Sequence, residues 1–416
     1  MDIFKRQSKS RCLSLAFGCT ILTALALPFS TALTNVFSIA TIVFWILGAD
    51  LKSDFRRLLG KTFSCALLLF LLFVCLSVFW KEGSWQSYWS ELKNYRRFIF
   101  LLIVFLLVQE KEEWSEGVIF AFYISTAFLT LVCIGIYLGL PFFPPQQPGQ
   151  GAVLSKSHIA QGFLLGCHIV IAIRYLVFSK HIELKVLAAI TGSLTFVVTV
   201  FMTYGRTGYL CVVLAIILAT VFFSLKSKKQ WMKYFLGALV IAVAMVSYSN
   251  HVQTRWDNAQ TDIVRFEHGD MDSSMGLRFY FWKTSLNIIK DNPVIGVGCG
   301  SIRAVSCRYA EGSPNEDGSC FDFPNPHQDY LFVIAQYGIV GFLLWLAFFC
   351  GIGKECFRCS QEDKWTIFGI TTLYLAGSFF NTFSRDITEC TAFVILIAAL
   401  LALANRAQSE ENPDTI

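Results

Sequence analysis

The stretch TGYLCVVLAIILATVFFSL at residues 207–225 carries no charge, and three lysines follow it at once, Lys226, Lys228 and Lys229. A helix needs about 20 mainly apolar residues to cross a bilayer, so this stretch predicts a membrane-spanning helix that ends at a basic surface. Further apolar runs lie on both sides of it along the chain. The twelve predicted spans are 12–30, 33–50, 62–80, 96–109, 117–140, 158–178, 184–204, 207–225, 233–250, 328–351, 364–381 and 388–405.

The composition agrees with a membrane protein. Hydrophobic residues make up 55% of the 416 residues and charged residues 15%, and the mean hydropathy is +0.56. A soluble domain would carry about 25% charged residues. The apolar runs do not show the alternation of a transmembrane β-barrel. We therefore predict an all-α polytopic membrane protein with about twelve transmembrane helices.

Basic residues gather in alternate loops of this twelve-span model. The positive-inside rule places such loops in the cytoplasm, and acidic residues such as those at 110–116 weigh little in it. Both termini then lie inside. The loops before span 1 and after spans 2, 8 and 10 contain Lys5, Arg6, Lys9, Arg11, Lys52, Arg56, Arg57, Lys61, Lys226, Lys228, Lys229, Lys233, Lys354, Arg358 and Lys364.

One long hydrophilic segment, residues 251–327, interrupts the spans and lies outside in this model. The chain accordingly divides into nine spans at 1–250, this external loop, three spans at 328–405 and a cytoplasmic tail at 406–416. The loop holds seven Lys or Arg and ten Asp or Glu. An anionic substrate would therefore be held by individual cations and not by a basic surface.

The external segments have recognisable local patterns. Within the long loop, 277–290 has apolar residues along one helical face, and Asn292-Pro293 ends that helix. Gly296, Gly298 and Gly300 then predict a flexible turn. Residues 80–95 place three tryptophans among charges, as in a helix at the membrane interface. Residues 141–157 are rich in Pro, Gly and Gln and are predicted to be irregular.

Three of the fourteen cysteines, Cys299, Cys307 and Cys320, lie in the external loop. An oxidising compartment permits one disulfide among them. Three pairings are possible, and the sequence does not choose between them. Cys356 and Cys359 form an isolated C-x-x-C on the cytoplasmic side, and we do not interpret it as a metal site.

Three residues near the borders of the external loop carry the chemistry that we predict. Arg206 lies beside Gly205 at the external end of spans 7 and 8, Arg278 is in the loop helix, and His327 precedes span 10. A guanidinium binds phosphate in a bidentate manner and keeps its charge, while an imidazole can take a proton near neutral pH. The alternatives are a headgroup contact for Arg206, a salt bridge to Asp272 for Arg278 and a helix cap for His327.

Six more basic residues map to the same external face and are predicted to contribute to substrate binding. Each could instead be an interfacial anchor, but their convergence favours a cavity that binds an anion. They are Lys93, Arg96, Arg97, Lys156, His158 and Arg385.

The segments GLRFYFWKTSLNIIKDNPVIGVGCGSI (276–302) and NPHQDYLFVIAQYGIVGFLLWL (325–346) resemble the signature block of the bacterial O-antigen ligase/polymerase superfamily. Arg206-Thr207-Gly208 is similar to the upstream arginine motif of that family. The resemblance covers roughly residues 155–350. Within the superfamily, the chain length and Ser157-His158-Ile159 look most like the ligase that joins O-antigen to lipid A–core.

The resemblance implies a GT-C-like glycosyltransferase in the inner membrane of a Gram-negative bacterium, with its active site at the periplasmic face. The donor would be O-antigen glycan on undecaprenyl pyrophosphate, and the acceptor a sugar hydroxyl of lipid A–core. Arg206 and Arg278 would stabilise the departing pyrophosphate, and His327 would be the general base of an inverting transfer. We expect no metal, no cofactor and no nucleic-acid partner, and membrane lipid around the spans.

Other functions remain open. A polymerase or a protein O-oligosaccharyltransferase of the same superfamily would use related motifs. A secondary transporter also fits twelve spans, although transporters usually consist of two related halves with broken helices near the midplane. A structural subunit of a polysaccharide complex would not need the two arginines and the histidine.

Overall fold

The computed structural model describes residues 2–225, 273–311 and 319–411, together with a few positions between 233 and 265. Within this part of the chain the protein is all-helical, and the only β-type pairings are isolated bridges between Gln147, Gly151 and Thr203. The ninth predicted span, 233–250, lies largely outside the described residues, as do Lys226, Lys228, Lys229 and Asp272.

The helices follow the predicted apolar runs closely. Short 3-10 turns at Ser77–Phe79 (η1) and Lys93–Tyr95 (η2) and a π-helical turn at Val198–Met202 (η3) extend some of them. The α-helices are α1 (Asp2–Ala26), α2 (Thr31–Gly48), α3 (Leu51–Leu59), α4 (Thr62–Leu76), α5 (Trp85–Leu92), α6 (Arg96–Val108), α7 (Glu112–Tyr137), α8 (His158–Phe178), α9 (Ile182–Val197), α10 (Arg206–Leu225), α13 (Ser274–Asp291), α14 (Ile302–Tyr309), α15 (Asp329–Cys356), α16 (Gln361–Gly377) and α17 (Ile387–Glu411).

Eight of the described helical segments are long and apolar enough to cross a membrane. These helices agree with a polytopic membrane protein. Their number among the described residues is smaller than the twelve spans predicted from the whole sequence. The predicted spans 1, 4 and 11 form α1, α6 and α16, which do not meet the same requirement of length and composition. α6 has 13 residues and α16 has 17, so each is shorter than about 20 residues.

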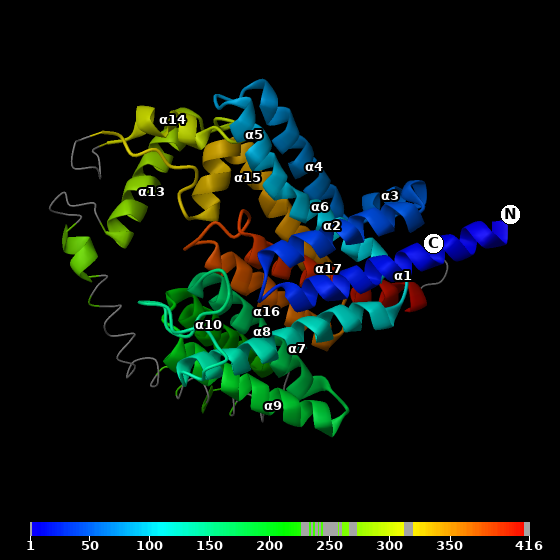
Figure 1. The fold of residues 1–416 in the computed structure, drawn as a ribbon. Helices are drawn as coiled ribbons and strands as arrows, with labels where there is room; N and C mark the ends of the chain where they lie inside the picture. Colours follow the sequence, from blue (N-terminus) through cyan, green and yellow to red (C-terminus); the bar gives the residue numbers. More distant parts are fainter. Residues whose placement is uncertain are drawn as a thin grey trace.

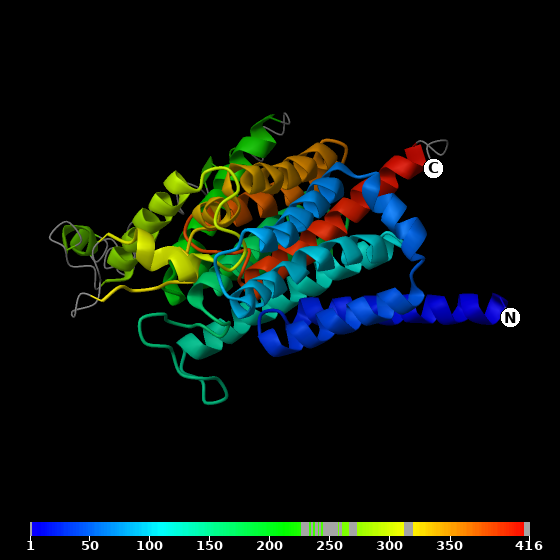
Figure 2. The same ribbon diagram turned by 90° about the horizontal axis from the view of Figure 1, so that it is seen from above.

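The long helices run side by side (Figures 1 and 2). α1 and α2 form a hairpin on one flank of the bundle (Figure 2). The N-terminus and the end of α17 lie at one end of the bundle, which we call the terminal end. Helices α5, α13 and α14 lie at the opposite end (Figures 1 and 2), which we call the site end.

The centre of the bundle is occupied by α17, with α6 and α8 against it. All side chains from Cys390 to Ala404 of α17 are buried, and α17 packs on α6, α7 and α16. By contrast α9 has exposed apolar residues along its length, including Ile182, Val186 and Ile190. A helix that is apolar all round and buried lies inside a bundle, whereas exposed apolar side chains on α9 fit a lipid-facing position.

An ion cluster around a buried arginine joins three helices at the terminal end. Arg174 of α8 is 2% exposed and contacts Glu116 of α7 and Glu362 and Asp363 of α16, at 2.6, 2.9 and 2.6 Å. Removing Arg174 would leave the nearly buried carboxylate of Asp363 without its cation. Glu116 is one of the acidic residues at 110–116, in a stretch where the positive-inside rule would favour basic residues. Its ion pair with Arg174 gives it a structural role.

The α15 helix is interrupted at Gly338, which has φ 60° and ψ −166°. A side chain there would collide with the backbone of Val294, so only glycine fits this position. The segment after α13 satisfies the backbone groups freed by the break: Val297 N–H donates to Ala335 O and Ile339 N–H to Pro293 O. The glycine turn that we predicted as flexible is therefore held firmly against α15.

Candidate active site

His327 occupies a strained corner at the start of α15. Its φ is 53°, and it is the one residue other than glycine with positive φ in the described chain. Its N–H donates to Asn325 Oδ1 at 2.8 Å, and Thr382 Oγ1 donates to the same oxygen at 3.1 Å. Such a conformation costs on the order of 1–3 kcal/mol and is common at functional sites. Gln328, and not His327, caps the helix, which disfavours the capping alternative.

Helix α13 holds this corner in place from one side. Trp282 Nε1 donates to Pro326 O at 3.0 Å, and the rings of Phe281 and His327 are 6.1 Å apart. Arg278 lies one turn earlier on the same helix. The helix that the sequence predicted at 277–290 thus orients both an arginine and the segment that carries the histidine.

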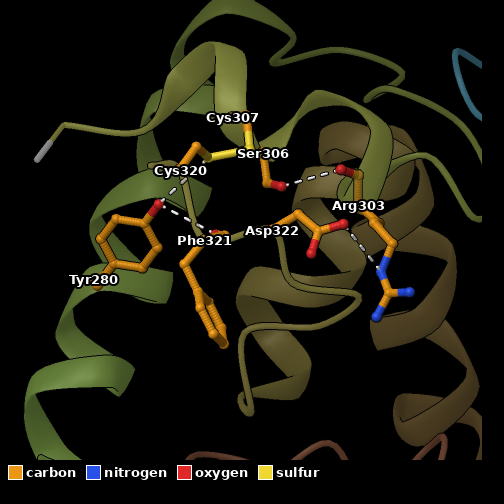
Figure 3. Close-up of a disulfide and its surroundings, with 7 residues drawn as sticks. All are labelled: Tyr280, Arg303, Ser306, Cys307, Cys320, Phe321 and Asp322. Atoms are coloured by element: carbon orange, nitrogen blue, oxygen red, sulfur yellow. Dashed lines mark hydrogen bonds and ion pairs between the residues drawn. A yellow bond between two sulfur atoms is a disulfide. The ribbon is translucent and has the colours of Figure 1, made fainter. Parts of the chain in front are cut away.

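A disulfide between Cys307 and Cys320 adds a covalent link (Figure 3). It joins α14 to the segment that leads to His327, and the Tyr280 hydroxyl of α13 donates to Phe321 O at 3.2 Å beside it. Cys299 is buried and free. Of the three pairings allowed by the sequence, the structure contains this one. The bond closes a loop of separation 13, which on a chain-entropy estimate stabilises the fold by roughly 3 kcal/mol.

The two arginines of the predicted site lie close together. The Arg206 guanidinium, at the start of α10, contacts Met275 Sδ at 3.2 Å, and Met275 lies one turn before Arg278 on α13. Burial, together with the positive charge of Arg206, lowers the pKa of Arg278. Among the described residues, no carboxylate lies within ion-pair distance of Arg278. A pair of cations with such an arrangement can hold an anion between them.

A chain of polar contacts fixes the ring of His327. Its Nδ1 is 3.3 Å from Asn381 Oδ1, Asn381 Nδ2 donates to Asp386 Oδ2 at 2.9 Å, and Asp386 Oδ1 pairs with Lys156 Nζ at 2.9 Å. An ionised carboxylate only accepts hydrogen bonds, so the Asn381 amide must turn its oxygen toward His327. Nδ1 then carries the proton, and Nε2 is left with a free lone pair. This arrangement prepares Nε2 to accept a proton.

The His327 imidazole is biased toward its neutral form. Burial lowers its pKa below the usual 6.5, and the charges of Arg278 and Arg385 act in the same direction. The contact with Asn381 and the charge of Asp386 oppose this shift. The neutral form is the one that can act as a base.

His327 also lines a cavity of about 180 Å³ at the site end. The other walls are the loop between α16 and α17 and the turn before α6. The lining residues are Asn94, Asn325, His327, Asn381, Thr382, Arg385 and Asp386. All are polar or charged, so the cavity suits a hydroxylated ligand better than an apolar one.

The structure divides the six further basic residues into two groups. Two of them adjoin the cavity: Arg385 lines it, and Lys156 pairs with its wall residue Asp386. Arg97 lies beneath, buried, and donates to the carbonyl oxygens of Ser384 and Arg385 at 3.4 and 2.9 Å. It therefore holds the loop rather than lining the cavity.

The remaining three are placed elsewhere. Arg96 donates to Asn35 of α2 at 2.6 Å, and Lys93 is exposed in η2. The Nδ1 atom of His158 is 3.1 Å from Gln150 Oε1, and its ring packs against Gly205, next to Arg206. The structure thus brings His158 to the arginine pair, whereas Arg96 faces the α2 helix.

The role of Asp329 in holding the site together was not predicted from the sequence. Buried Asp329 accepts hydrogen bonds from Ser378 Oγ and from Ser384 N–H and Oγ. It thereby clamps the loop between α16 and α17 to the start of α15. The signal in the sequence was the dense run of hydrogen-bonding residues at 378–386, of which Arg385 was predicted to contribute to substrate binding.

We expect Asn381→Ala to lower turnover about tenfold, because one buried hydrogen bond to the ring contributes on the order of 1 kcal/mol. Losing this contact should also move the acid limb of the pH–rate profile to lower pH, since the contact raises the pKa of His327. Asn405→Ala, at the far end of α17, should change neither quantity. A lower rate with an unshifted pH profile would instead assign Asn381 a purely structural role.

The fold and the site describe a class: a helical membrane protein with two neighbouring arginines, a histidine whose pKa is lowered by burial, and a polar cavity at one end of the bundle. Residues 191–346 match the family model described as O-antigen ligase, which supports membership of the O-antigen ligase superfamily. This segment contains Arg206, Arg278 and His327, whereas Asn381, Asp386 and Lys156 lie outside it. A search of curated proteins finds no match to the chain.

Proposed function

We propose that this protein is a metal-independent, inverting glycosyltransferase that transfers O-antigen glycan from undecaprenyl pyrophosphate to a sugar hydroxyl of lipid A–core. The observation that carries the proposal is the arginine pair beside a histidine whose Nε2 is free to take a proton. We propose that the site end faces the periplasm of a Gram-negative inner membrane and that both termini are cytoplasmic.

In the proposed reaction the acceptor oxygen attacks the anomeric carbon of the donor glycan, from the face opposite the pyrophosphate. The new C–O bond forms as the bond to the phosphate oxygen breaks, and the electron pair leaves with the pyrophosphate. The hydroxyl proton passes to Nε2 of His327. Attack from the opposite face inverts the anomeric configuration.

Arg206 and Arg278 would bind the pyrophosphate and stabilise the charge that develops on its leaving oxygen. Preorganised donors of this kind contribute most when charge appears during the reaction. An anion bound to both guanidinium groups would offset the repulsion between their charges, which favours binding of a highly charged leaving group. The lipid tail would lie along the apolar surface of neighbouring spans.

The superfamily also includes polymerases, whose acceptor is another lipid-linked glycan. We favour a ligase because Ser157-His158-Ile159 resembles the corresponding segment of the ligases. The transporter alternative is less favoured, since Arg206, Arg278 and His327 lie at one end of the bundle instead of at its middle.

The proposed function is tested by reconstituting the purified protein in vesicles with undecaprenyl-pyrophosphate-linked O-antigen and lipid A–core. We expect O-antigen to become attached to lipid A–core, with release of undecaprenyl pyrophosphate and with the same rate in a chelator. Elongation of the lipid-linked glycan without attachment to lipid A–core would identify a polymerase. Absence of any glycosyl transfer would contradict the proposal.

A further inference from the structure

A second cavity, of about 450 Å³, adjoins the one that contains His327. It lies between α5, the turn at Gly300 and the segment before His327, and we call it the α5 groove. Its walls include Gln86, Ser87, Ser90 and Glu91 of α5. This volume falls in the range of small-molecule binding sites, about 300–1,000 Å³. None of the candidate site residues except Arg385 lines it.

Helix α5 turns a polar side toward this groove. Gln86 and Ser90 are one turn apart, as are Ser87 and Glu91, so the four side chains share one face. Trp85 and Trp89 occupy a different face and are 60% and 52% exposed. Exposed tryptophans are typical of helices at a membrane interface. The groove thus lies where the sugar part of a membrane-anchored glycolipid would be found.

The groove has fixed walls. Ser301 is fully buried, and its Oγ accepts hydrogen bonds from the N–H groups of Glu82 and Gly83, each at 3.0 Å. A side chain at Gly300 would collide with the backbone of Ser87, so the turn and α5 are in direct contact. A binding site on such supported elements is preorganised and loses little entropy on binding.

One ion pair separates the α5 groove from the His327 cavity. Arg385 donates to both oxygens of buried Glu91, at 3.1 Å from Nε and 2.8 Å from Nη2, and Arg385 lines both spaces. A saccharide in the groove would therefore present a hydroxyl beside the pocket of the base. Hydroxyl and amide groups of Gln86, Ser87 and Ser90 are suited to hydrogen-bond its other hydroxyls.

The groove does not contain the two arginines, and this indicates which of the two substrates it would bind. Arg206 and Arg278 lie at the starts of α10 and α13 and line neither cavity. In an inverting transfer the nucleophile and the leaving group stand on opposite sides of the reacting carbon. We propose that the α5 groove binds the acceptor saccharide and that the Glu91–Arg385 pair guides its hydroxyl to His327. This inference rests on the glycosyl transfer proposed above.

The test is equilibrium binding of lipid A–core and, separately, of the undecaprenyl-pyrophosphate-linked donor to purified protein. Ser90→Trp fills the groove, and Gln86→Ala removes one polar group from it. We expect Ser90→Trp to weaken lipid A–core binding at least about tenfold and Gln86→Ala several-fold, with donor binding unchanged in both. Lys290→Trp, an exposed position at the end of α13 that does not line the groove, should leave both affinities unchanged.

Binding is measured without turnover. The result therefore tests the proposed acceptor site separately from the proposed glycosyl transfer. If the wild type binds lipid A–core and Ser90→Trp binds it equally well, the groove is not the acceptor site. If donor binding weakens instead, the groove holds the donor glycan. If the wild type binds lipid A–core through the groove but does not glycosylate it, only the proposed function is contradicted.

Discussion

His327→Ala should lower the turnover number about 10²- to 10⁴-fold, the usual contribution of a positioned general base. The neutral imidazole is not one of the two cations proposed to bind the pyrophosphate, so the affinity for the undecaprenyl-pyrophosphate donor should change little. Single-turnover transfer and equilibrium donor binding, measured on the same preparation, separate these two effects. His181→Ala, an exposed histidine before α9, is the matched control and should be as active as the wild type.

The pH dependence provides an independent check of the base. Because burial and Arg278 lower the pKa of His327, the neutral ring persists below pH 6.5. The rate should therefore be insensitive to pH near neutrality and should fall only as the pH drops through a value below 6.5. If the alanine variant lost donor binding and kept its single-turnover rate, His327 would be a ligand. Asp386, which lines the same cavity, would then be the first alternative base.

Arg278→Ala should lower the transfer rate about 10²- to 10³-fold, or by about 3–4 kcal/mol of transition-state stabilisation. Arg206→Ala should have a similar effect, and the two losses should not add, because both residues act on the same anion. Arg278→Lys should restore little activity, since an ammonium cannot reproduce the two parallel hydrogen bonds of a guanidinium. Rates with saturating acceptor and varied donor measure these effects.

Lys283→Ala serves as the control for Arg278→Ala. Lys283 lies on the same helix, is exposed and pairs with Glu311 at 2.9 Å, so its loss should leave the transfer rate within about twofold. Full activity of Arg278→Lys would show that only the charge matters. Full activity of Arg278→Ala would remove this residue from the site.

The sequence predicted the elements around the site well. Helix α13 was expected at 277–290, and the observed helix is Ser274–Asp291, because an apolar helical face and an Asn-Pro stop are local signals. Local composition also predicted two other segments correctly. Residues 141–157 are irregular, and a short helix, α5, lies among the tryptophans at 80–95. The number of spans agrees less well: α6, predicted as a span at 96–109, is central and buried, but its 13 residues are fewer than a membrane-crossing helix needs.

The amino-acid sequence by itself determined that the protein is helical and apolar, and it identified Arg206, Arg278 and His327 as the groups suited to phosphate and proton chemistry. Those properties depend on residue type and on neighbours within a few turns. Only the tertiary structure decided that Asn381 sets the tautomer of His327, that Cys307 pairs with Cys320, and that Arg385 meets Glu91. Arg385 and Glu91 are 294 residues apart, and a contact over such a distance depends on how whole helices pack, which no local pattern encodes.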